Sequence, residues 1–204
     1  MTEQELVALA QAGDQDAFAQ LVEANQNKIY TLALRMTGNS EDAADLAQEA
    51  FLKVWRALPD FQGESGFSTW LYRLTSNLCI DFLRRENRRR SIASISSLDD
   101  EEGPLPTDVP DRRFTPEDEL ERRELRTAVD RGLRRLSDEH RQVLALRAVE
   151  GLSYTEIAGV LDLEVGTVKS RIARARSALR TILLKDGNFS PPTASNQMKH
   201  DGKE

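Results

Sequence analysis

The stretch from Gly166 to Arg180 constrains this chain most, because it joins an apolar stripe to a run of cations. Its apolar residues recur at the spacing of one helix face: Val168, Ile172, Ala175 and Leu179. Five basic residues lie off that stripe, with no acidic residue among them: Lys169, Arg171, Arg174, Arg176 and Arg180. Such a helix can pack on a protein core and still offer cations to phosphates and base edges.

A short capped helix is predicted directly before this basic helix. Ser153 and Glu156 have the spacing of a capping box, and apolar residues continue to Leu161. Residues 162–164 can form a turn, after which the basic helix opens at 165–167. A short helix, a tight turn and a basic helix are typical of a helix-turn-helix, whose second helix enters the DNA major groove. The alternative is an arginine-rich solvated face on an ordinary bundle helix, and the capped helix and turn favour DNA binding over it.

The overall charge indicates how such a motif is used. The chain has 204 residues and a net charge of −6, which argues against a general nucleic-acid coat. Positive charge is concentrated in residues 84–90, where five arginines accompany Glu86, and in the basic helix. A protein of this kind is expected to bind DNA weakly alone and to need a partner that holds it there.

Apolar periodicity and capping residues predict helices along the whole chain and no strand. Gly13 and Gly38 end the first two helices, Asp14 caps the second, Ser40 starts the third, and Ser68 caps the fourth. The sequence therefore predicts an all-α fold of two small helical domains joined by a flexible acidic linker. The first domain spans 1–90, the linker 91–116, and the second domain, with the helix-turn-helix, 117–184; 185–204 is a disordered tail.

Several classes of protein are disfavoured by what the sequence lacks. The single cysteine, Cys79, excludes an internal disulfide and is expected to be a buried, inert thiol. No run is apolar enough for a membrane span and no signal peptide is recognisable, so a cytoplasmic location is expected. We also expect no metal, no cofactor and no catalytic residue, because no nucleophile–base pair, ligand cluster or phosphate-binding glycine loop appears.

Three stretches carry a resemblance to a known family: residues 45–51 (DLAQEAF), 67–73 (FSTWLYR) and 151–171, which contains GLSY and VGTVKSR. Each is moderately specific alone, and in this order they are highly specific. The chain resembles the extracytoplasmic-function (ECF) sigma factors, the promoter-specificity subunits of bacterial RNA polymerase, over about residues 3–182. This resemblance implies binding to core polymerase, recognition of the −10 and −35 promoter elements, and control by an anti-sigma factor.

The resemblance also implies roles for residues of the first domain. Contact with a coiled coil of the polymerase clamp is implied for Asp45, Gln48 and Glu49; the alternative is a solvated acidic face. Capture of the unwound −10 strand is implied for Phe61, Phe67, Asn77, Arg84, Arg85 and Arg88. Trp70 and Tyr72 are additional candidates, but for Trp70 a place in the core is favoured.

In the second domain, the resemblance implies that the basic helix reads the −35 element as duplex DNA. The reading positions are Lys169, Ser170, Arg171, Ala173 and Arg174, whereas Arg176 and Arg180 are expected to touch phosphate. The linker is implied to pass through the polymerase cleft and RNA exit channel.

Two other functions remain as alternatives. The first is an ordinary helix-turn-helix regulator whose N-terminal domain senses a ligand or dimerises, although the aromatic and arginine-rich segment 61–90 is not needed for duplex binding. The second is an enzyme, which the missing catalytic patterns disfavour. A further hypothesis is that the two domains of the free protein pack together and hide both DNA surfaces.

Overall fold

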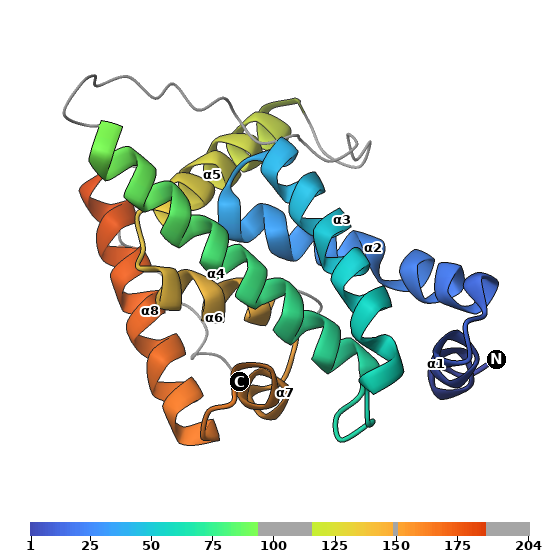
Figure 1. The fold of residues 1–204 in the computed structure, drawn as a ribbon. Coiled ribbons are helices and arrows are strands. Elements are labelled where there is room, and N and C mark those ends of the chain that lie inside the picture. The colour runs from blue at the N-terminus through green and yellow to red at the C-terminus, as the bar shows by residue number, and fades with distance from the viewer. Residues whose placement is uncertain (94–115, 149–150, 187–204) are drawn as a thin grey trace, which may run out of the picture.

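The computed structural model describes residues 1–93, 116–148 and 151–186, and Figure 1 shows that they form a helical bundle. The N-terminal domain contains α1 (Glu3–Gln11), α2 (Gln15–Thr37), α3 (Ser40–Ala57), the 3-10 helix η1 (Leu58–Asp60) and α4 (Phe67–Ala93). The C-terminal domain contains α5 (Pro116–Arg134), α6 (Asp138–Ala148), α7 (Tyr154–Leu161) and α8 (Val165–Lys185). No strand occurs within the described ranges, and the predicted all-α fold is confirmed.

The predicted linker and tail fall mostly outside the described residues. Of the linker, only its first residues, in the last turn of α4, and Pro116, the first residue of α5, are described. Of the tail, only Lys185 and Asp186 are described, at the end of α8. Residues 91–93, Pro116 and Lys185 are thus helical, and apart from Asp186 the rest of the predicted flexible linker and disordered tail lies outside the described residues.

Side chains and glycines end the helices largely as predicted. The Asp14 carboxylate accepts hydrogen bonds from the backbone of Asp16 and Ala17, and Gly38 ends α2 with a left-handed φ of +75°. The third helix starts at Ser40, as predicted, and Asn39 caps it, because the Asn39 side-chain oxygen accepts from Glu41 and Asp42. The predicted cap at Ser68 is wrong by two residues. The fourth helix begins at Phe67, so Ser68 already lies inside it.

The two domains share one hydrophobic core. In the N-terminal domain α2 packs against α1, α3 and α4, and it also contacts α5 and α6 of the C-terminal domain. A contiguous cluster of buried apolar side chains joins Leu32 and Met36 of α2 to Leu146 of α6 and Ile157 of α7. Burying each such side chain stabilises the fold by roughly 1.5–3 kcal/mol, so separating the domains would expose a substantial apolar surface.

Arginine side chains join the domains at backbone carbonyl groups. The buried Arg141 of α6 donates to the carbonyls of Leu133 and Met36 at 3.0 and 2.9 Å. Arg134 donates to the Gly38 carbonyl at 3.1 Å. The bonds to Met36 and Gly38 supply donors to carbonyls at the end of α2 that its own helix cannot pair. At the other end of the contact, Arg73 of α4 donates to a carbonyl of α7 at 2.6 Å.

Cys79 lies in the core of the N-terminal domain, as predicted. It is fully buried on α4, and burial raises the pKa of its thiol to about 12. Because the thiolate is the reactive form, this environment makes the side chain inert at neutral pH. Among the described helices, none is long and apolar enough to cross a membrane.

Candidate nucleic-acid and partner interfaces

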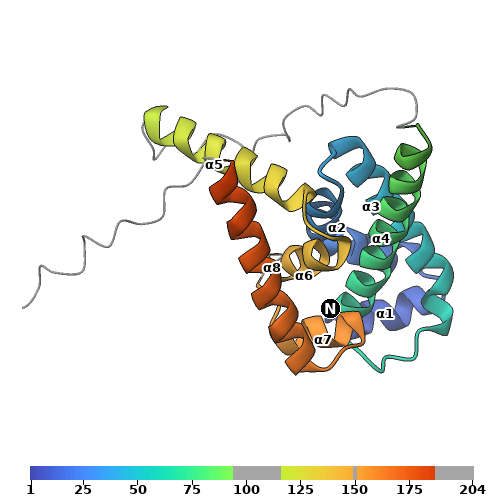
Figure 2. The same ribbon diagram turned by 90° about the vertical axis from the view of Figure 1, so that its left-hand side faces the viewer.

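The basic helix α8 presents its two faces as predicted. Val168, Ile172 and Ala175 are buried against the rest of the C-terminal domain, and Leu179 is half-buried. The exposed residues are Lys169, Ser170, Ala173, Arg174, Arg176 and Arg180. Figure 2 shows α8 on the far side of α6 from the N-terminal domain. The domains do pack together, but they leave these residues uncovered, so the hypothesis of a hidden DNA surface is wrong for this helix.

Local hydrogen bonds fix the helix-turn-helix. The Ser153 amide donates to the Glu156 carboxylate at 2.7 Å, and the Ser153 hydroxyl accepts from the Glu156 amide at 3.2 Å. These bonds form the predicted capping box, and they hold the pKa of the Glu156 carboxyl below its usual value. Asp162 then turns the chain in the left-handed conformation, with φ +53°. Helices α7 and α8 pack on each other, which sets the direction of α8.

Two predicted reading cations have partners on other helices that the sequence did not indicate. The Arg171 guanidinium lies 3.5 Å from the Glu139 carboxylate of α6, and its side chain is only 22% exposed. The Lys169 ammonium lies 6.0 Å from the centre of the Tyr154 ring, and Arg147 approaches the same ring at 5.5 Å. These contacts restrict the directions in which Arg171 and Lys169 point before DNA arrives.

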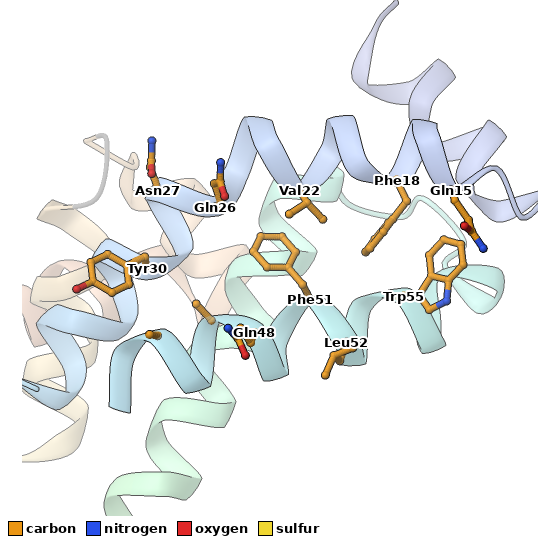
Figure 3. A pocket seen from close by; sticks show the side chains of 12 residues that line it. Gln15, Phe18, Val22, Gln26, Asn27, Tyr30, Gln48, Phe51, Leu52 and Trp55 are labelled. Carbon is orange, nitrogen blue, oxygen red and sulfur yellow. The ribbon is translucent and has the colours of Figure 1, made fainter. Parts of the chain in front are cut away.

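An open apolar groove of about 820 Å³ lies between α2 and α3 (Figure 3). Its walls are mainly aromatic and aliphatic, and polar amides line its edges. Phe18 of α2 packs on Trp55 of α3 with ring centres 4.7 Å apart, and Leu52 is 56% exposed. Leu52 and Trp55 lie off the apolar stripe that predicts the buried face of α3. The presence of these apolar residues outside the stripe is the sequence signal that indicates a second apolar face on α3.

The three residues implied in polymerase binding do not form one cluster. Gln48 lines the apolar groove. Asp45 and Glu49 face away from it and line a small hollow between α3 and α4. The Glu49 carboxylate lies 3.1 Å from the Lys53 ammonium on the same helix. Helix α3 therefore presents two chemically different surfaces, one apolar with an amide and one charged.

The basic segment of α4 lies beside the charged face of α3. Glu49 and Lys53 share a second hollow with three arginines implied in −10 binding: Arg84, Arg85 and Arg88. Asn77, Arg84 and Arg88 are exposed, and their spacing places them above one another on one face of α4. The structure therefore brings the predicted partner-binding carboxylate and the predicted strand-binding cations to one side of the domain.

The aromatic residues around the 61–66 loop have different environments. The half-buried Phe61 stacks on Trp70, with ring centres 4.7 Å apart and planes 28° apart. Phe67 is 3% exposed and belongs to the hydrophobic core. It cannot offer a ring face to a base in this arrangement, because the first turn of α4 directs it inward. Tyr72 is also buried, whereas Trp70 is half-buried and packs against the hydrophobic core.

Comparison with known proteins places both domains in one family. Residues 21–89 match Sigma-70 region 2, and residues 126–179 match Sigma-70, region 4. The ECF RNA polymerase sigma-E factor of Escherichia coli K12 is 40% identical over 182 residues, which covers 88% of this chain and 93% of that protein. The RNA polymerase sigma-H factor of Pseudomonas aeruginosa is 40% identical over 177 residues, or 87% and 91% of the two chains.

A solved structure shows the same architecture. The structure of CnrH in complex with the cytosolic domain of CnrY has a TM-score of 0.64 and 29% identity, covering 90% of this chain and 98% of that chain. The similarity thus extends through α1–α4 and α5–α8 together, in sequence and in fold. Relatives that are 40% identical span nearly the whole chain. This protein therefore belongs to the ECF RNA polymerase sigma factors, and it directs RNA polymerase to promoters for transcription initiation.

Proposed function

We propose that this sigma factor works through three surfaces, two of which adjoin where Glu49 of α3 lies beside Arg84 and Arg85 of α4. One, on α3, binds core RNA polymerase; the second, on α4 and the 61–66 loop, captures the unwound −10 strand; the third, on α8, reads the −35 duplex. The observation that carries this proposal is that most of the predicted DNA-binding side chains on α8 and α4 are exposed, while the apolar sides of both helices are buried. The exceptions are Arg171, which is partly buried, and Phe67, which is in the core. The protein acts in the cytoplasm, where polymerase and promoter DNA are found.

On α8, the predicted DNA-binding residues divide by chemistry. Arg171 and Arg174 can form paired hydrogen bonds to guanine, and Ser170 can bond to several bases. Lys169 and Ala173 complete the reading face. Arg176 and Arg180, further along the helix, are assigned to phosphate, which positions the helix without reading sequence.

The −10 surface combines stacking with positive charge. Phe61 is the aromatic candidate, since its ring is half-buried rather than buried like Phe67. Asn77 offers an amide to the edges of unpaired bases. Arg84, Arg85 and Arg88 continue along α4 and offer cations to the strand's phosphates.

The polymerase surface is assigned to α3, where an amide and two carboxylates flank exposed apolar residues. Gln48 with Leu52 and Trp55 suits a partner helix that carries both amide and aliphatic groups. Asp45 and Glu49 suit its basic residues. CnrH forms a complex with the cytosolic domain of CnrY, which supports a protein regulator, here an anti-sigma factor, that competes for such a surface.

Run-off transcription tests the function directly. A genomic promoter library is transcribed by bacterial core polymerase with and without this protein. Defined start sites that appear only when both are present support the proposal, and their alignment supplies the two promoter elements. If the protein does not change transcription by core polymerase but still protects duplex DNA, the ordinary-regulator alternative is correct.

A matched pair of double variants tests the polymerase surface. Asp45→Ala with Gln48→Ala is expected to weaken binding to core polymerase and to leave −35 duplex contact unchanged. Asp16→Ala with Gln20→Ala removes the same two groups from an exposed part of α2 that does not line the groove. Equal polymerase binding by both variants would contradict the assignment of α3.

A further inference from the structure

Helix α1 is bonded to the chain segment that leads into the 61–66 loop. The Gln11 side-chain amide donates to the Leu58 carbonyl at 3.0 Å and to the Phe61 carbonyl at 2.8 Å. One amide group thus pairs with both ends of the turn formed by η1. Phe61 is the residue at which the loop begins, so Gln11 fixes the backbone that carries this ring.

The same helix is bonded to the segment that follows the loop. The Ser68 hydroxyl in the first turn of α4 donates to the Glu3 carboxylate at 2.9 Å. Glu3 and Gln11 are the first and last residues of α1, so the helix spans the distance between the two bonds. Figure 1 shows α1 beside the η1 end of α3 and the start of α4, and α1 contacts both η1 and α4.

The composition of the 61–66 loop does not favour an ordered conformation unless both of its ends are held. Gln62, Gly63, Glu64 and Gly66 are exposed, and Gly63 has a φ of +73°. Such a segment is ordered only if its ends are held, because fixing backbone dihedral angles loses conformational entropy. The stack of Phe61 on Trp70 contributes on the domain side, and α1 contributes at both ends.

We propose that α1 is a brace that sets the position of the 61–66 loop for capture of the unwound −10 strand. Gln11 is its main positioning residue and Glu3 its second. The inference rests on the proposed −10 function of Phe61 and α4. It extends that function to a helix outside residues 21–89, the part that matches Sigma-70 region 2. Preorganising the loop removes an entropy loss that strand binding would otherwise carry.

The test compares Gln11→Met with Gln4→Met in full-length protein bound to core polymerase. Methionine preserves the length and helix propensity of glutamine but cannot donate a hydrogen bond. Gln4 is an exposed residue of the same helix, so its replacement controls for changes in α1 itself. The probes are a single-stranded −10 oligonucleotide, its single-base variants and a −35 duplex, taken from a promoter found in the transcription library.

We expect Gln11→Met to bind the −10 strand about tenfold more weakly, as loss of two partly buried hydrogen bonds implies. Its preference among −10 bases should become flatter, while −35 binding stays close to that of Gln4→Met. Hydrogen exchange at residues 61–67 should accelerate. Gln11→Glu, which points a carboxylate at two carbonyl oxygens, should give a larger effect of the same kind.

Two outcomes would overturn the brace. In the first, hydrogen exchange in the loop is unchanged in both Gln11 variants, which would mean that α1 does not order the loop. In the second, exchange in the loop accelerates but −10 affinity and base preference equal those of Gln4→Met, which would mean that the order of the loop does not affect strand capture. Phe61→Ala and Asn77→Ala, measured in parallel, separate these results from failure of the −10 assignment, because in that case they too would bind the strand normally.

Discussion

The two DNA-facing surfaces that we propose for this sigma factor are built in different ways. The −35 surface is a single helix whose exposed and buried faces follow from residue spacing within α8. The −10 surface combines a loop, the exposed face of α4 and bonds from α1, which lies about fifty residues earlier in the chain than the loop. One surface is therefore local, whereas the other depends on tertiary contacts.

The contrast extends to the side chains that serve each surface. On α8, four of the predicted DNA-binding cations are exposed: Lys169, Arg174, Arg176 and Arg180. Arg171 is partly buried, and its guanidinium lies beside the Glu139 carboxylate. Around the loop, aromatic residues adjacent in space have separate roles, since Phe67 is in the core and Phe61 is half-buried. A substitution at the −10 surface is thus more apt to change stability and binding together than one on α8.

The largest expected effect separates the two phenylalanines. Phe67→Ala should lower the free energy of unfolding by about 3–5 kcal/mol, because it removes a buried ring and leaves a cavity. Phe61→Ala should lower it less and weaken −10 strand binding instead. Urea denaturation and oligonucleotide titration measure the two effects. A stable Phe67→Ala protein that fails to bind the strand would show that Phe67 is the contact residue.

The next largest effect is expected at the contact between the two domains, which holds the two surfaces in one arrangement. Arg141→Met should lower the free energy of unfolding by about 3 kcal/mol, because buried carbonyls of α2 and α5 lose their donor. Arg135→Met, which removes an exposed ion pair with Asp186, should change it by less than about 1 kcal/mol. Equal effects in denaturation experiments would mean that Arg141 does not join the domains.

On the −35 surface, Arg171→Ala and Arg176→Ala should differ in kind. The first should lose about 1–3 kcal/mol of binding and relax the preference at one base pair. The second should weaken binding to all sequences similarly and reduce the salt slope by about one. Titration of holoenzyme with single-base −35 variants at several salt concentrations distinguishes them. A uniform loss from Arg171→Ala would assign this residue to phosphate.

The smallest expected effect tests the partner of Arg171. Glu139→Gln should strengthen −35 binding about two- to threefold, because an exposed ion pair is worth less than about 1 kcal/mol and its loss frees the guanidinium. Asp138→Asn removes the same charge from the same helix turn and should have a smaller effect. The gain should vanish in an Arg171→Ala background; if it persists, Glu139 acts only through long-range charge.

The sequence alone determined the local features of this protein. Helix spacing, the Ser153–Glu156 capping box and the Gly38 terminus predicted the helical elements and the faces of α8 correctly, because all of these depend on neighbours within one or two turns. The same local order of residues carried the family resemblance, which the comparisons confirmed. The roles of individual residues at the three surfaces remain predictions that the proposed variants test.

Contacts between residues far apart in the sequence were visible only in the folded protein. Gln48 lies on a different side of α3 from Asp45 and Glu49, and Phe67 lies in the core. Arg141 bonds one domain to the other, and Gln11 bonds to the Phe61 carbonyl. No pattern in the sequence specifies these pairs, because a side chain's partner across a bundle is set by how whole helices pack. Periodicity fixes which face of a helix is apolar, but only packing fixes which surface covers that face.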